Sequence, residues 1–158
     1  MGFALSDLQL SSDAFPGGGR IPERYTGIGK DVSPPLRWSN VPVETRSFAL
    51  FCHDPDAPLV LPGSYGFTHW VLYNIPGSVR ELPEAVDQYT LGRGDFGKDR
   101  YGGPLPPPGH GVHHYYFWLA ALGLQISLPP GLTLRQLLGQ IEPHVIGMNR
   151  LVGIFERS

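Results

Sequence analysis

Hydrophobic residues gather in three runs of strand length, at positions 47–52, 67–75 and 112–122. Each run contains aromatic or β-branched residues, and the second stops at a Pro-Gly pair, which favours a turn. A run with interrupted alternation opens the chain at 3–10, and a short run closes it at 151–155. These patterns predict a protein built mainly of β-strands.

Alternation within two of these runs predicts which side chains share a face of a sheet. Along 67–75 the two predicted faces are His69, Val71 and Tyr73 on one side and Trp70, Leu72 and Asn74 on the other. Along 112–122, His113 and Tyr115 are expected on one face and His114 on the opposite one.

One helix is expected near the carboxyl end. Thr133 and Gln136 have the spacing of a capping box, in which each side chain bonds a backbone N–H of the other residue. An apolar stripe follows at Leu134, Leu137, Leu138 and Ile141. Pro143 ends or kinks this helix, and the pattern predicts a second helical turn over 144–149.

Composition changes this picture in one respect. The chain has 21 glycines and 17 prolines among 158 residues, about a quarter of the total against roughly 12% in average proteins. This excess excludes a helical bundle or a coiled coil and predicts many turns. Because 41% of the residues are hydrophobic, we expect a folded chain, and its length fits a single domain over residues 1–158.

Charge and cysteine content exclude several classes of function. Charged residues are 16% of the chain and the net charge is −2, with no basic block, so we expect no nucleic-acid partner. The single cysteine, Cys52, excludes an internal disulfide and is expected in the core. With no export signal and no apolar stretch of 18 residues, we expect a cytoplasmic protein with no membrane span.

Five of the six histidines lie between positions 53 and 114, at strand ends or beside a loop at 91–111 that is rich in glycine and proline. Imidazoles near the carboxylates Asp54 and Asp56 are suited to binding an anion, ligating a metal or transferring protons. No recognised metal-ligand spacing is present, and the neighbours His113 and His114 face opposite ways, so we expect no metal. A long irregular loop before such residues is typical of a functional site.

The sequence does not support two common enzyme motifs. No G-x-S-x-G elbow is present, so a serine nucleophile is not indicated. Residues 92–97 match G-x-G-x-x-G, but no helix is expected after them, and we therefore predict no dinucleotide and no other cofactor. The convergence of polar groups instead favours a shared binding pocket that includes Tyr115.

Four segments, 54–58, 69–76, 101–104 and 109–115, have the motifs and order of a known family. The sequence resembles the phosphatidylethanolamine-binding proteins, also called Raf kinase inhibitor-like proteins, and specifically their short bacterial and archaeal branch. The resemblance runs from residue 11 to residue 157. It implies a large antiparallel β-sheet with Greek-key connections, a smaller second sheet and a C-terminal helix. It also implies a small cavity at one end of the sheet that takes phosphate or a phosphoethanolamine head group.

The resemblance also implies which residues form that site. The implied ligand-binding residues are Asp54, Asp56, His69, His113 and Tyr115, with Gly103 and Pro104 at the rim. Both histidines and the tyrosine can donate hydrogen bonds to phosphoryl oxygens, and Asp54 can orient a histidine or meet the ammonium of a head group. Asp56, with Pro55 and Pro58, is expected to set the turn, and we hypothesise a cis bond there.

This sequence departs from many bacterial members at two positions. Leu105 stands where they have a cysteine, and His114 stands where they have an arginine, which removes a thiol and a fixed cation from the rim.

We predict a non-enzymatic protein that binds a small anion and that modulates a kinase or protease partner, and we leave a homodimer open. The alternative is a hydrolase or phosphoryl-handling enzyme that uses a His/Asp pair in the same pocket. Anion affinity is expected to fall as pH rises through the pKa values of the pocket histidines.

Overall fold

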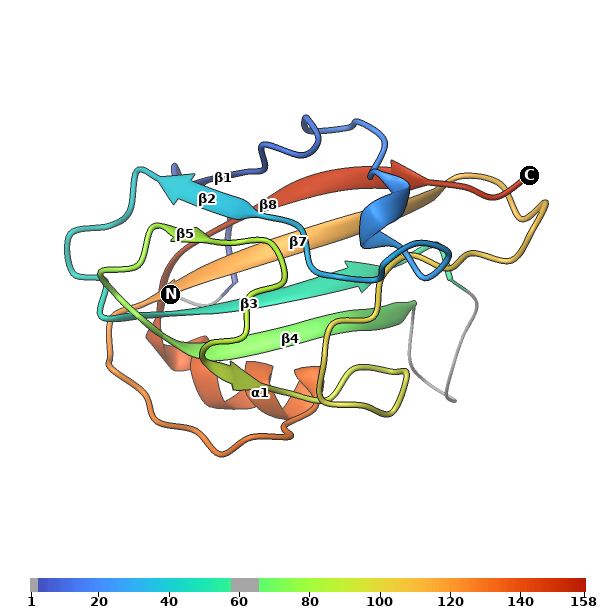
Figure 1. The fold of residues 1–158 in the computed structure, drawn as a ribbon. Coiled ribbons are helices and arrows are strands. Elements are labelled where there is room, and N and C mark those ends of the chain that lie inside the picture. Colours follow the sequence, from blue (N-terminus) through green and yellow to red (C-terminus); the bar gives the residue numbers. More distant parts are fainter. Residues whose placement is uncertain (1–2, 58–65) are drawn as a thin grey trace.

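The computed structural model describes residues 3–57 and 66–158, which form two antiparallel sheets and one α-helix (Figure 1). Its elements are β1 (Gln9–Ser11), the 3-10 turn η1 (Glu23–Tyr25), β2 (Leu36–Ser39), β3 (Ser47–Asp54), β4 (Phe67–Pro76), β5 (Glu81–Leu82), β6 (Thr90–Leu91), β7 (His113–Leu122), α1 (Leu134–Ile141), the 3-10 turn η2 (Glu142–His144) and β8 (Val145–Phe155). The predicted fold class, mainly β with a second sheet and a helix near the carboxyl end, is therefore confirmed.

The larger sheet has the strand order β6-β4-β3-β7-β8, and the smaller one has the order β1-β2-β5. Within the larger sheet, β7 returns after a long connection to pair with β3, on the side opposite to β4. The order β7-β3-β4-β6 is that of a Greek key, in which the fourth strand lies beside the first. The expected Greek-key connection is thus present.

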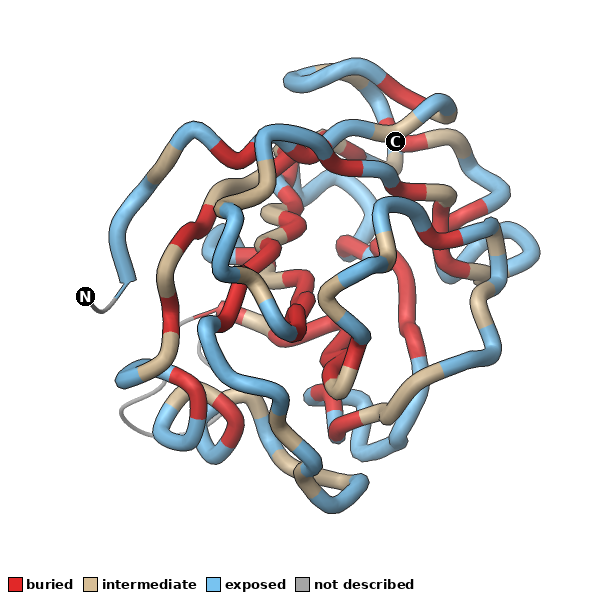
Figure 2. Tube along the Cα trace, turned by 90° about the vertical axis from the view of Figure 1, so that its left-hand side faces the viewer, coloured by how far each residue is buried: buried red, intermediate tan, exposed pale blue. Residues whose placement is uncertain are grey.

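Three layers result from this arrangement, with the larger sheet in the middle (Figure 1). One face packs Phe48 and Leu50 of β3 against Leu36 and Trp38 of the smaller sheet. The other face is covered by α1 (Figure 1). Because both faces are covered, β3 is a nearly continuous apolar segment, which explains why its sequence lacks polar alternation. Figure 2 shows the buried residues concentrated toward the interior of the molecule and the exposed ones on the outer loops.

The helix forms as its capping residues predict. The Thr133 hydroxyl accepts a hydrogen bond from the Gln136 backbone N–H, and the Gln136 side chain accepts one from the Thr133 backbone N–H. Leu137 and Ile141 are fully buried against the sheet. The capping box therefore starts the helix at the position that presents its apolar stripe to the core.

The predicted helical turn at 144–149 is wrong. Helical geometry ends with η2 at His144, and β8 begins at Val145. Pairing with β7 runs from Val145 opposite Leu122 to Phe155 opposite His113. A full ladder of backbone hydrogen bonds with β7 outweighs the weak local preference of the segment for a helical turn.

At the other end of the chain, the strand predicted at 3–10 is shorter than expected and begins later. β1 covers only Gln9–Ser11.

No helix in the described part of the chain is long and apolar enough to cross a membrane. Cys52 is buried on β3, as predicted for a core cysteine.

Candidate anion-binding cavity

Four strands of the larger sheet place their ends together. β3 ends at Asp54, its antiparallel neighbours β4 and β7 begin at Phe67 and His113, and β8 ends at Phe155 opposite His113. In an antiparallel sheet the end of one strand lies beside the start of the next. Residues that are far apart in the sequence therefore meet at this end of the sheet, on the right in Figure 1.

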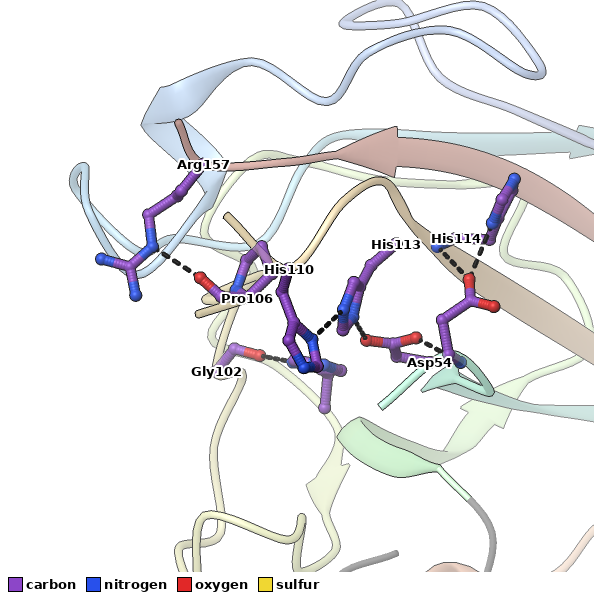
Figure 3. A network of polar contacts seen from close by, with 9 residues as sticks. Asp54, Gly102, Pro106, His110, His113, His114 and Arg157 are labelled. Carbon is purple, nitrogen blue, oxygen red and sulfur yellow. Dashed lines mark hydrogen bonds and ion pairs between the residues drawn. The ribbon is translucent and has the colours of Figure 1, made fainter. Parts of the chain in front are cut away.

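Asp54 and His113 form a buried pair there (Figure 3). The His113 Nδ1 atom lies 2.6 Å from Asp54 Oδ2, and Asp54 Oδ1 accepts a hydrogen bond from the Asp56 backbone N–H at 2.8 Å. Both carboxylate oxygens thus have partners within the protein, as burial of a charge requires. The pair fixes the His113 ring with its Nε2 atom directed away from Asp54.

The Nε2 atom of His113 is covered by a second histidine. His110 Nδ1 lies 3.1 Å from His113 Nε2, so one of the two nitrogens donates to the other (Figure 3). His110 is exposed and lies between Gly109 and Gly111, which both have positive φ. Those two glycines allow the sharp turn that places His110 over His113.

His69 is held by a backbone carbonyl. Its Nδ1 atom donates to the Gly102 carbonyl oxygen at 2.7 Å, because a carbonyl can only accept. Burial lowers the pKa of His69, and the opposing effects of the Gly102 carbonyl and the Asp54 carboxylate are smaller. The ring is therefore neutral at pH 7, and with the proton on Nδ1 its Nε2 is an acceptor.

A β-bulge places His69 on a face that alternation did not predict. Cys52 pairs with Trp70 but His53 pairs with Thr68, so His69 is the extra residue on β4. Its ring contacts that of Tyr115, with centroids 5.2 Å apart. A bulge puts two residues opposite one and breaks the period of two. The predicted grouping of His69 with Val71 and Tyr73 is therefore wrong.

A second irregularity on β4 affects Asn74. This residue has a φ of 57°, and its amide donates to the Leu128 carbonyl, beside the Tyr73 hydroxyl that donates to Pro129. Asn74 therefore lies with Tyr73 and not, as predicted, with Trp70 and Leu72.

These side chains surround a cavity of about 140 Å³. Its lining residues are Asp54, Ala57, Phe67, His69, Phe96, Leu105, Pro106, Pro107, His113 and Tyr115. This volume is well below the roughly 300–1,000 Å³ of sites for drug-sized ligands. The cavity is suited to one small polar group.

Tyr115 supplies a hydroxyl to this cavity. Burial raises the pKa of Tyr115, and the nearby Asp54 carboxylate raises it further, so the hydroxyl keeps its proton at all physiological pH values. It makes no hydrogen bond with any residue that the structure describes. Tyr115 is therefore a hydrogen-bond donor among the residues that line the cavity.

Asp56 lies beside the cavity and not in its lining. Its Oδ2 atom accepts hydrogen bonds from the backbone N–H and the Nδ1 of His114, both at 2.7 Å. Burial raises the pKa of Asp56, but these bonds from His114 outweigh burial and leave it below its ordinary value. The Asp56–His114 pair connects the end of β3 to the start of β7.

Gly103 and Pro104 are likewise not among the residues that line the cavity. The Gly103 N–H donates to Asp31 Oδ1 at 2.7 Å, and the Pro104 carbonyl accepts from the Gly27 N–H at 2.8 Å. A Cβ atom on Gly103 would lie 2.2 Å from the Tyr25 carbonyl oxygen, so only glycine fits. These residues join the loop before β7 to the segment around η1.

The hypothesis of a cis bond at Pro55 is wrong, because no cis peptide bond occurs in residues 3–57 and 66–158. The bond before Pro58 lies outside the described residues. The turn after β3 is made instead by the Asp54 side chain, whose bond to the Asp56 N–H is an Asx turn.

Sequence reasoning missed Phe67 and Phe96 as parts of this site. The two rings are 4.6 Å apart between centroids, and Phe96 also contacts the His69 ring at 5.6 Å. The sequence pattern predicts Phe67 only as the first residue of a strand, and Phe96 lies in an irregular loop. No sequence signal indicates this contact: Gly102 gives the Phe96 ring its space, since a Cβ atom there would lie 2.3 Å from the ring, but it is one of many glycines in the loop.

The fold and the cavity together define a class of protein, a two-sheet β-protein with a small polar cavity at one end of its larger sheet. Comparison with known proteins is consistent with this class. The family described as phosphatidylethanolamine-binding protein matches residues 11–156. The chain belongs to this family.

Relatives from archaea and bacteria match nearly the whole chain. A UPF0098 protein of Methanothermobacter thermautotrophicus is 43% identical, covering 96% of this chain and 100% of its own, and one of Aquifex aeolicus is 40% identical, covering 96% and 90%. The crystal structure of a putative phosphatidylethanolamine-binding protein homologue, CT736 of Chlamydia trachomatis, has a TM-score of 0.87 at 36% identity and covers 96% of this chain and 98% of its own. E. coli YbcL has a TM-score of 0.87 at 28% identity, covering 97% and 100%.

Proposed function

We propose that this protein is a non-enzymatic binding protein whose cavity takes a small phosphate-bearing ligand, such as inorganic phosphate or a phosphoethanolamine head group. The observation that carries the proposal is the convergence of His69, His113 and Tyr115 on one cavity of about 140 Å³. With Asp54, these residues are the four polar members of a ten-residue lining, and a few polar groups among apolar ones are typical of a site that fixes the orientation of a small ligand.

The hydrogen-bonding capacity of these groups suits a phosphate. The Tyr115 hydroxyl donates to a phosphoryl oxygen, and His69 Nε2 either accepts from a protonated phosphate oxygen or, once protonated itself, donates to an unprotonated one. Phosphate monoesters lose their second proton near pH 6. The pair of phosphate and His69 can thus share one proton.

Asp54 has a narrower role in this proposal than the resemblance implied. Both of its carboxylate oxygens already accept hydrogen bonds, one from His113 and one from the Asp56 N–H. We therefore assign Asp54 to orienting His113, and not to contacting the ammonium of a head group.

The direct test is a titration with inorganic phosphate and with O-phosphoethanolamine, followed by calorimetry and by the histidine resonances in NMR spectra. The double variant His69→Ala/His113→Ala should lose measurable affinity for both. His144→Ala is the matched control, because His144 lies at the opposite end of the larger sheet, and its affinity should equal that of the wild type. Unchanged affinity in the double variant would show that the site is assigned wrongly.

Affinity should fall as pH rises. Burial lowers the pKa of His69 in the free protein, and a bound anion raises it again, so binding takes up a proton. The dissociation constant for phosphate should rise by up to tenfold per pH unit between about pH 6 and 8. Calorimetry in two buffers of different ionisation enthalpy measures this proton uptake, and an affinity that does not change with pH would contradict the shared proton.

The Asp54–His113 pair also favours a second candidate, a phosphoryl hydrolase. A carboxylate 2.6 Å from a buried imidazole is the arrangement of a general base. Its Nε2, however, faces His110, and none of the described residues that line the cavity is a serine, threonine or cysteine. Turnover of p-nitrophenyl phosphate that is abolished by His113→Gln would favour the hydrolase over the binding protein.

The remaining predictions concern the setting in which binding occurs. Modulation of a kinase or protease, a homodimer and a cytoplasmic location stay predictions from the sequence and from its resemblance. The cavity mouth is formed in part by Phe96 and Leu105, each more than 40% exposed. A protein partner that docks over the cavity would cover these two side chains.

A further inference from the structure

A second cavity lies directly beside the first. It has a volume of about 230 Å³ and is lined by Gly27, Asp31, Phe96, Lys98, Arg100, Gly102, Gly103 and Leu105. Phe96 and Leu105 line both cavities. The two cavities are therefore separated by a ridge of two exposed apolar side chains, which we call the Phe96–Leu105 ridge.

The ridge has a defined position because glycines lie beneath it. The Phe96 ring lies against Gly102, and the Leu105 side chain would be 3.0 Å from a Cβ atom at Gly27. On the other side Phe96 packs against Phe67, with ring centroids 4.6 Å apart. A ligand that extends out of the first cavity would meet an apolar surface here and would reach the second cavity beyond it.

The second cavity contains unpaired positive charge. Lys98 and Arg100 are exposed and form no ion pair with any residue that the structure describes, whereas the nearby Arg93 is paired with Asp99 at 3.2 Å. The one carboxylate in the lining, Asp31, accepts a hydrogen bond from the Gly103 N–H. The lining thus carries two cations against one anion.

We propose that the second cavity is a subsite for an anionic group on the same ligand whose phosphate occupies the first cavity. The class of ligand is a phosphomonoester with a carboxylate or a second phosphate several bonds away, linked by a chain that crosses the Phe96–Leu105 ridge. This inference rests on the proposed function. It adds that the protein discriminates between phosphomonoesters by the charge at their far end.

The test compares two probes that differ only at that end. In 6-phosphogluconate a carboxylate stands where sorbitol 6-phosphate has a hydroxymethyl group, and both have six carbons and a terminal phosphate. Exposed ion pairs are weak, so we expect 6-phosphogluconate to bind roughly fivefold more tightly at low ionic strength, which corresponds to about 1 kcal/mol. This preference should shrink in 0.5 M salt because the cations are exposed.

Three variants assign the preference to residues. Lys98→Met/Arg100→Met should bring the affinity ratio of the two probes to about one, whereas Arg46→Met/Arg135→Met, which removes two exposed cations elsewhere, should leave the ratio unchanged. Asp31→Asn keeps an acceptor for the Gly103 N–H but removes the negative charge, so it should increase the ratio. All these residues except Asp31 are exposed, and unfolding midpoints would show that the variants are folded.

The outcomes separate this inference from the proposed function. The proposed second subsite is wrong if sorbitol 6-phosphate binds but the affinity ratio of the two probes is about one in the wild type. It is also wrong if Lys98→Met/Arg100→Met keeps the wild-type ratio. In both cases the proposed phosphate site is unaffected. If neither probe binds and inorganic phosphate does not bind either, the proposed function is wrong, and the proposed subsite is wrong with it. A ratio that disappears only in the Lys98/Arg100 variant supports both.

Discussion

The two histidines of the cavity are each held through Nδ1, His69 by the Gly102 carbonyl and His113 by Asp54. An imidazole has only two nitrogens, so a partner on one determines what the other can offer. The carbonyl requires a proton on His69 Nδ1, and burial keeps that ring neutral. Single hydrogen bonds thus decide which atoms are available to a ligand.

His69 should make stability depend on pH. Burial lowers the pKa of His69 in the folded protein, so below about pH 6.5, the ordinary value, the unfolded chain binds a proton that the folded protein does not. Stability is therefore full above about pH 6.5 and falls as the pH is lowered, by about 1.4 kcal/mol for each pKa unit between the two states. Urea unfolding at pH 5, 6 and 7 in phosphate-free buffer measures this dependence.

The variant His69→Asn isolates that effect, because its amide can still donate to the Gly102 carbonyl. Its stability should change less between pH 5 and 7 than that of the wild type. An identical pH dependence in both proteins would assign the effect to other groups.

Asp54 should matter for stability as well as for binding. Asp54→Asn keeps the shape but supplies one acceptor oxygen where two hydrogen bonds are now accepted, and we expect a loss of about 1–3 kcal/mol. Asp56→Asn is the matched control at an exposed pair and should cost less than about 1 kcal/mol. Chemical denaturation of the three proteins at pH 7 gives both values, and equal losses would contradict the buried role of Asp54.

At the scale of elements, β4 shows how one irregularity changes a site. Its bulge at His69 moves that side chain to the face that holds Tyr115. The helix α1 shows the opposite case, because its capping box and apolar stripe are local and act as the sequence indicates. Local signals are reliable where the partner lies within a few residues, and they fail where a neighbouring strand determines the geometry.

Two threonines provide a matched test at this scale. Thr133→Ala removes the helix cap and should cost about 1 kcal/mol. The Thr45 hydroxyl is buried and lacks a hydrogen-bond partner among the described residues, so Thr45→Val, which replaces it by a methyl group, should leave stability unchanged or raise it. Thermal unfolding of both variants measures the difference. A Thr45→Val variant as destabilised as Thr133→Ala would show that the hydroxyl has a partner.

At the scale of the whole molecule, the carboxyl end of the chain contacts the loop whose prolines line the cavity. The Arg157 side chain donates to the Pro106 carbonyl at 2.6 Å (Figure 3), and the Arg157 carbonyl accepts from the Gly109 N–H. The loop before β7 is thus tied to the segment after β8. This contact joins residues 51 positions apart and supports the wall that Pro106 and Pro107 form.

Loss of this contact should weaken both binding and folding. Arg157→Ala is expected to reduce phosphate affinity severalfold, with a change of about 1 kcal/mol in stability, because a single part-buried hydrogen bond is lost. Arg135→Ala, at an exposed position on α1, should change neither quantity. Calorimetric titration and urea unfolding distinguish the two effects, and equal phosphate affinity in Arg157→Ala and wild type would show that the wall needs no such support.

Much of the fold could be predicted because it depends on short-range patterns. The strands at 47–52, 67–75 and 112–122, the burial of Cys52 and the cap of α1 are local consequences of hydrophobic period and capping chemistry. The extent of β8 could not be predicted, since its first residues gain their partners only from β7. The predicted faces of His69 and Asn74 are wrong for the same reason, because the bulges exist only within the paired sheet.

The amino-acid sequence by itself determined the chemical types at the site: two imidazoles, a carboxylate and a phenol on segments that end or begin strands, beside a loop rich in glycine and proline. Only the tertiary structure decided that Asp54 holds His113, that Gly102 holds His69, that Gly103 and Pro104 are not among the residues that line the cavity, and that a second cavity with Lys98 and Arg100 adjoins the first. The physical reason is distance along the chain. Residue types and local geometry follow from neighbours in sequence, whereas hydrogen-bond partners and cavities depend on which strand ends the antiparallel sheet brings together.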